Sequence, residues 1–165
     1  MNALRVSCFT VLASLLLFSC QPVKVPDSIE KDATTNETAY DSMLAAKWGA
    51  DEYGMRTYVL AFVNKGPNRS QDSATTAIIQ KAHLDNITRL ADEGKIALAG
   101  PFLDDWATRG IFIYNVKTIE EAEALFATDP ATKAGRIVAE YHLWFGSAAL
   151  MAVNDLHKKI SKSKI

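Results

Sequence analysis

Cysteine and histidine are scarce in this chain. Its two cysteines, Cys8 and Cys20, both lie within the first twenty residues. The rest of the sequence therefore excludes a disulfide framework, thiol catalysis and a cysteine-based metal site. The three histidines, His83, His142 and His157, include no two with the spacing of a metal-binding pair on a helix. Phosphate-binding glycine loops and the Gly-x-Ser-x-Gly motif are also absent, so we expect neither a metal nor an organic cofactor.

Charge of one sign is not in excess either. The formal net charge at pH 7 is −1 for the 165 residues. A nucleic-acid-binding domain usually carries a clustered basic surface, so we expect no nucleic-acid partner. Lysines gather only at the end of the chain, where we interpret residues 149–165 as a basic tail. Such a tail either frays in solvent or touches an anionic membrane surface.

The longest apolar run stands at the N-terminus. Residues 6–18 are almost entirely apolar and follow the positively charged Arg5. This run is too short to span a bilayer comfortably and fits the core of a signal peptide, residues 1–19. It ends in the letters LFSC, which resemble the lipobox of bacterial lipoproteins and imply acylation of Cys20. We therefore expect a lipid anchor in a membrane of the bacterial cell envelope, with the domain outside the cytoplasm; the alternative is an ordinary secretory signal.

The remaining chain divides by composition and by the period of its apolar residues. Residues 20–38 are polar and predict a flexible tether, and residues 39–56 contain a short amphipathic helix. A folded domain is expected at 57–148, with strands at 57–63, 95–99, 110–116 and 137–145 and helices at 73–93 and 118–126. The order β-α-β-β-α-β predicts a ferredoxin-like α+β fold, in which two helices cover one face of a four-stranded antiparallel sheet.

The predicted strands are apolar on both faces. In the first strand Tyr58, Leu60 and Phe62 point to one side, while small and aliphatic residues point to the other. Two helices cover only one face of the sheet, so the second face would be a large exposed hydrophobic patch. We expect a second copy of the chain to cover it, giving a homodimer with facing sheets. The alternative cover is the N-terminal helix or the C-terminal tail.

His83 lies where the predicted helix 73–93 should be apolar. It stands one turn after Ile79 and one turn before Ile87, on the face that packs against the sheet. Histidine is the side chain whose charge changes near neutral pH without perturbation. His83 is therefore either a hydrogen-bonded core residue or a working acid and base.

The predicted topology places three carboxylates at the same edge of the sheet as His83. Asp104 and Asp105 lie in the loop between the second and third strands, and Asp129 follows the second helix. A carboxylate bonded to an imidazole fixes its tautomer and stabilises its charged form, which suits general acid–base catalysis. The alternative assigns Asp104 and Asp105 to a solvated hairpin tip and Asp129 to a helix start.

Short motifs between residues 58 and 144 resemble the YCII-related family of small dimeric α/β-barrel proteins. In order they are HL at 83–84, EGK at 93–95, GP at 100–101, Gly110, EEA at 120–122, DP at 129–130 and Gly135. In that family the histidine and the aspartate before proline are regarded as the catalytic pair, which implies these roles for His83 and Asp129. The resemblance implies a metal-free elimination, isomerisation or hydrolysis of a small molecule. The alternative is a ligand-binding or dimerising module without turnover.

Overall fold

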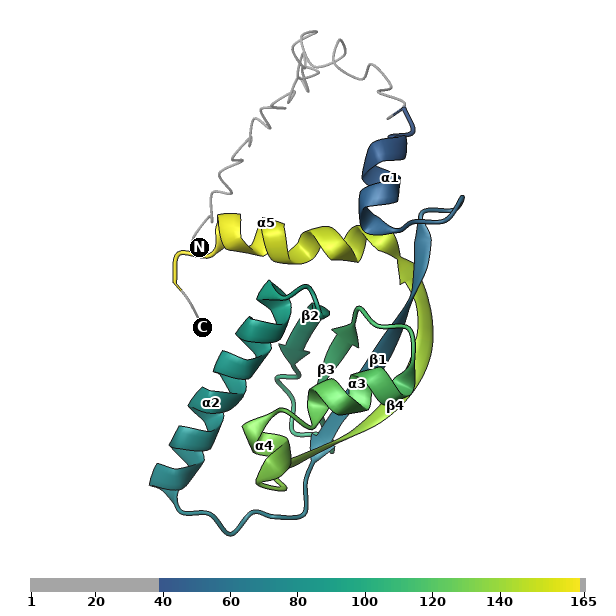
Figure 1. Cartoon of the computed structure of the whole chain (residues 1–165). Helices are drawn as coiled ribbons and strands as arrows, with labels where there is room; N and C mark the ends of the chain where they lie inside the picture. The colour runs from purple at the N-terminus through teal and green to yellow at the C-terminus, as the bar shows by residue number, and fades with distance from the viewer. Residues whose placement is uncertain (1–38, 164–165) are drawn as a thin grey trace, which may run out of the picture. The chain divides into compact units, whose positions relative to one another are not determined.

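Four strands form one antiparallel sheet in the order β2-β3-β1-β4 (Figure 1). They are β1 Met55–Lys65, β2 Ile96–Pro101, β3 Thr108–Tyr114 and β4 Ile137–Ser147. This computed structural model confirms the predicted ferredoxin-like α+β fold. It describes residues 39–163, so the predicted signal peptide, the tether and Cys20 lie outside the described residues.

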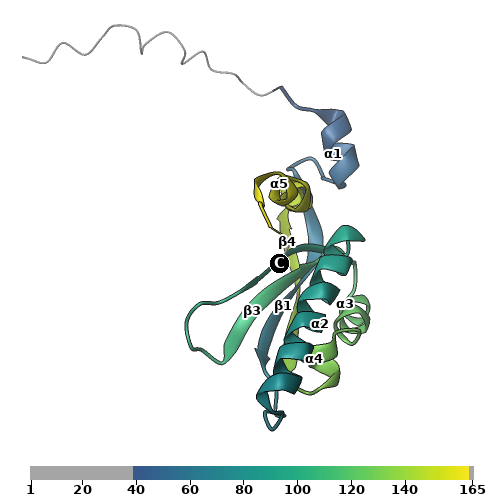
Figure 2. The same cartoon turned by 90° about the vertical axis from the view of Figure 1, so that its left-hand side faces the viewer.

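Three helices cover one face of the sheet, as Figure 2 shows for α2, α3 and α4. The described helices are α1 Ser42–Trp48, α2 Ser73–Asp92, α3 Ile119–Phe126, α4 Pro130–Lys133, the 3-10 helix η1 Ala148–Ala152 and α5 Val153–Ile160. Between residues 39 and 163, no helix has the length and apolar character needed to cross a membrane. Helical periodicity did not predict α4, because a helix of four residues shows no such period.

Side-chain caps fix where the covering helices begin. The carboxylate of Asp72 accepts a hydrogen bond from the Thr75 backbone N–H and starts α2. Thr118 and Glu121 form a reciprocal capping box at the start of α3. Gly94 adopts a φ of 68° just after α2, a conformation that glycine takes at little cost. These local signals set the register in which α2 presents His83 to the sheet.

The main core lies between the sheet and the helices α2 and α3. Its buried members alternate along the strands, as period-two burial requires. They are Val59, Ala61, Val63, Leu90, Ile96, Phe112, Tyr114, Ala122 and Phe126. Asp129 is the one buried polar or charged residue among those described.

The chain's own C-terminus covers part of the opposite face of the sheet. Leu150 and Met151 pack against a second apolar cluster centred on Tyr58. The side-chain amide of Asn154 donates to the Ile96 carbonyl at 2.7 Å, which ties α5 to β2. The expected basic tail, residues 149–165, is therefore helical up to Ile160: Leu150 and Met151 pack against the sheet, while Leu156, Ile160 and the lysines of α5 are exposed. Lys158 also pairs with an Asp on α2.

Candidate active site

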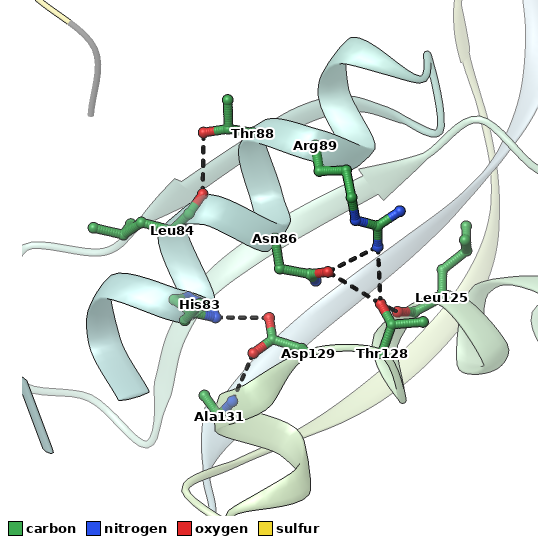
Figure 3. Close-up of polar contacts among 9 residues, drawn as sticks. All are labelled: His83, Leu84, Asn86, Thr88, Arg89, Leu125, Thr128, Asp129 and Ala131. Atoms are coloured by element: carbon green, nitrogen blue, oxygen red, sulfur yellow. Dashed lines mark hydrogen bonds and ion pairs between the residues drawn. The ribbon is translucent and has the colours of Figure 1, made fainter. Parts of the chain in front are cut away.

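His83 and Asp129 form a direct pair between α2 and the start of α4 (Figure 3). The distance from His83 Nδ1 to Asp129 Oδ2 is 2.7 Å. The Asp129 side chain is 1% exposed and the His83 side chain 15% exposed. His83 is therefore the member of the pair that a small molecule can reach, and Asp129 is the buried member behind it.

The second oxygen of Asp129 holds the backbone. Oδ1 accepts a hydrogen bond from the Ala131 N–H at 2.8 Å, which caps the N-terminus of α4. Pro130 occupies the first helical position, where a missing N–H has no cost. The Asp-Pro motif is thus a helix start, as one interpretation of the sequence held, and it also aims a fixed carboxylate at His83.

A polar network beside the pair joins α2 to the end of α3. The guanidinium of Arg89 donates to Asn86 at 2.8 Å and to the Thr128 hydroxyl at 3.3 Å. Thr128 in turn donates to the Leu125 carbonyl at 2.7 Å (Figure 3). These contacts hold the residue next to Asp129 against the helix that carries His83, so the pair is supported from both elements.

The contact with Asp129 restricts where the imidazole carries its proton. An ionised carboxylate only accepts hydrogen bonds, so with Asp129 in this form Nδ1 of His83 donates to it. In the neutral ring Nε2 is then the acceptor, and in the charged ring it becomes a donor. A histidine held in this way can take a proton from a bound molecule and return it.

Aromatic rings wall the pair on the side of the sheet. The His83 ring stacks on Phe112, with centroids 6.3 Å apart and planes at 28°. Tyr114 packs edge-on to Phe112, and its hydroxyl has no hydrogen-bond partner among the described residues. Burial raises the pKa of Tyr114, and the neighbouring Tyr141 and Asp129 raise it further, so this phenol stays protonated. Burial likewise raises the pKa of Tyr141 to about 12.

A cavity of about 550 Å³ opens between α2 and the sheet edge, with His83 in its wall. This volume lies in the range of small-molecule sites. Its apolar walls include Val63, Leu84, Ile87, Ala99, Pro101, Phe112 and Ile137. The remaining lining residues are Arg69, Gln80, Thr88, Gly100, Arg109, Gly110 and Arg136. The cavity therefore combines an apolar interior, one imidazole and three guanidinium groups.

Asp104 and Asp105 do not line this cavity. The Asp105 carboxylate is exposed and pairs with Lys65 at 2.8 Å and with Arg109 at 3.2 Å. The Lys65 hydrogen bond and the charges of Lys65 and Arg109 lower the pKa of Asp105. Asp104 contributes its backbone carbonyl to Arg109 at 3.2 Å. The topology thus placed this loop at the correct edge, where it holds Arg109 rather than contacting His83.

Sequence reasoning missed the three arginines. Arg69 lies between β1 and α2, Arg109 is the second residue of β3, and Arg136 precedes β4. All three stand at the edge of the sheet that already held His83 and Asp129 in the predicted topology. A search of that edge for basic residues, as well as for carboxylates, would have found them.

Metal-ligating groups do not gather elsewhere in the described part of the chain. No cluster of three or more histidine, cysteine, aspartate or glutamate side chains occurs within residues 39–163. His142 pairs with Glu140 at 3.2 Å and packs edge-on to Phe62, away from the cavity lining. Glu140, His142 and Trp144, which share one face of β4, do not line the cavity.

Comparisons with known proteins relate the domain to one family. The sequence model described as the YCII-related domain matches residues 57–144. Among solved structures, the 5-chloro-2-hydroxyhydroquinone dehydrochlorinase of Burkholderia phenoliruptrix AC1100, in complex with 2,5-dihydroxybenzoquinone, has 22% sequence identity and a TM-score of 0.40. That match covers 52% of this chain and 92% of the other chain. No curated protein matches the sequence.

Proposed function

Because the chain belongs to the YCII-related family, we propose that its domain processes a small molecule by acid–base chemistry at His83. The observation behind this proposal is the 2.7 Å contact between His83 Nδ1 and the buried Asp129 carboxylate, at the wall of a cavity. The reaction class is a metal-free elimination, isomerisation or hydrolysis. Each of these requires a group that moves a proton on the bound molecule.

The two residues have different roles in this proposal. His83 Nε2 accepts a proton from the bound molecule, because Nδ1 is engaged with Asp129. The Asp129 carboxylate stabilises the imidazolium that forms and orients the ring. Phe112 stacks against the face of the His83 ring. Together with the Asp129 contact, this packing fixes the direction in which the imidazole presents its other nitrogen to the cavity.

Turnover of a compound library by the full chain tests this function. Mass spectrometry follows product formation and deuterium uptake in D₂O, because reversible proton abstraction leaves deuterium on carbon. We expect His83→Gln to reduce turnover by about 100-fold or more, within the range that general acid–base catalysis contributes. Asp129→Asn should reduce it strongly as well, since the amide can stabilise the wrong tautomer.

Lys81→Gln is the matched control, because Lys81 lies on α2 but its exposed side chain pairs with Asp85. This variant should keep full activity. A ligand that binds wild-type protein and His83→Ala equally, with no proton exchange, contradicts the enzymatic proposal and leaves a binding module.

The proposed location is the bacterial cell envelope, with Cys20 acylated and the domain outside the cytoplasm. Support comes from the apolar run at residues 6–18 and the LFSC letters that end it. Several acyl chains on one cysteine hold a protein at a membrane far longer than one chain does. Mass spectrometry of the native protein should find a lipid-modified Cys20, and an unmodified mature terminus elsewhere contradicts the anchor.

We also propose a homodimer through the face of the sheet that the helices leave open. Leu60, Phe62 and Ile111 lie on this face and are half-buried, and Val138 beside them is 44% exposed. The C-terminal segment packs over Tyr58, so it covers only one end of this face. A second copy would bury the remainder.

A further inference from the structure

We propose that the cavity beside His83 binds a small organic anion, whose oxyanion is held by Arg109 and Arg136 while its apolar body lies against Phe112. This inference rests on the proposed function, since it names the chemical class of the molecule that His83 acts on. It adds a specificity that neither the His83–Asp129 pair nor the family implies.

The arginines are positioned by the protein and retain free donors. Arg109 is held through Nη1 by the Asp104 carbonyl and the Asp105 carboxylate, both at 3.2 Å. Arg136 is held through Nη1 by the Gln71 amide oxygen at 2.7 Å. In each guanidinium the contacts described use one terminal nitrogen, and a guanidinium has five N–H donors. The other donors are available to a carboxylate or a similar oxyanion.

The charge of the cavity wall favours an anion. Among the described residues that line it there are three arginines and no aspartate or glutamate. Asp105 lies outside the lining and is shared between Lys65 and Arg109, so one carboxylate faces two cations. Arg69 adds a third positive group at the same wall, where its Nη1 donates to the Arg136 carbonyl at 3.0 Å. A cavity with this balance attracts negative ligands and repels cations.

Because part of the cavity wall is apolar, an organic anion fits the cavity better than a bare inorganic anion does. Phe112, Leu84 and Ile87 lie on the wall together with His83, and a hydrated ion would gain nothing from these surfaces. A ring or short chain with one oxyanion satisfies both halves of the cavity. Its reactive carbon would lie against the imidazole, with the charge at the arginine side.

Benzoate and its neutral isostere benzamide are the probes that test this inference. The full chain is labelled with ¹³Cε1-histidine in detergent micelles, where its three histidines give three signals. We expect benzoate to shift the His83 signal saturably and to leave the His142 and His157 signals in place. Benzamide should bind at least about tenfold more weakly, since loss of one charge-assisted contact is of that size.

Variants of Arg109 and Arg136 test whether the cavity recognises the charge of benzoate or only its shape. Arg109→Gln and Arg136→Gln should each weaken benzoate binding about tenfold and change benzamide binding little. Arg109→Lys should recover part of the affinity, because it restores the charge without the fork of donors. Lys81→Gln, which removes a positive charge elsewhere on α2, should have no effect. The His142 and His157 signals report whether each variant is folded.

Equal binding of benzoate and benzamide would overturn the inference while the small-molecule cavity stands. Unchanged benzoate affinity in both glutamine variants would overturn it as well. If neither probe moves the His83 signal, the anion inference fails, and turnover by the His83–Asp129 pair is then judged by the library experiment alone.

Discussion

At the scale of single residues, Asp129 has two tasks that use different oxygens. Oδ1 caps α4 through the Ala131 N–H, and Oδ2 holds the His83 ring. A residue that only capped a helix would not need to be 1% exposed and aimed at a histidine. A residue that only served His83 would not need the proline after it. The helix-start interpretation of the Asp-Pro motif is therefore compatible with a role for Asp129 beside His83, and the catalytic role stays a prediction.

Substitution of Asp129 should separate these two tasks. Asp129→Ala should lower the free energy of unfolding by about 2–4 kcal/mol, because it removes a cap and leaves Nδ1 of His83 unpaired. Asp129→Asn keeps a side-chain oxygen for the cap and should cost only about 1–2 kcal/mol. Urea unfolding measures both values. Equal losses in the two variants would show that the cap contributes nothing.

At the scale of elements, the site depends on how closely β2 and β3 approach each other. A Cβ at Gly110 would lie 2.5 Å from the Gly100 carbonyl oxygen and 3.0 Å from the Pro101 Cα. Both strands contribute to the cavity wall here. Gly110 therefore allows the strand contact that closes one side of the cavity.

Alanine should destabilise the domain at Gly110 and have little effect at Gly100. Gly110→Ala should destabilise the domain by about 1–3 kcal/mol, because the neighbouring strand must move. Gly100 lines the same cavity, but a Cβ added there would have no atom within 4 Å. The stability of the Gly100→Ala protein should therefore change little. Thermal unfolding of the two variants makes the comparison. A Gly110→Ala protein as stable as Gly100→Ala would contradict this account of the strand contact.

Sequence patterns predicted the long elements and missed the short or mixed ones. Strand alternation and helical periodicity gave the order of the ferredoxin-like fold, and short motifs gave the family that the match over residues 57–144 confirms. The pattern failed for α4, which has only four residues, and for α5, whose lysines outweighed the apolar residues before it. The three arginines of the cavity, Arg69, Arg109 and Arg136, were missed because they are far apart in the sequence and come together only in the folded domain.

At the scale of the whole molecule, the open face of the sheet carries the proposal of a dimer. Light scattering on residues 36–165 should give twice the mass of one chain. Phe62→Arg should make the protein monomeric, because it places a charge in the centre of the proposed interface. Ile78→Arg, at a 70% exposed position on α2, is the control and should leave the dimer intact. A stable wild-type monomer would contradict the facing-sheet arrangement.

The central claim is that Asp129 fixes the His83 ring with its Nδ1 proton inward and Nε2 toward the cavity. ¹⁵N NMR of histidine-labelled full chain measures this tautomer directly, with His142 and His157 as internal references. The account predicts that the neutral His83 ring is protonated at Nδ1, and that Asp129→Asn redistributes the proton toward Nε2. A neutral His83 protonated at Nε2 in the wild type, or one unchanged by Asp129→Asn, would contradict it.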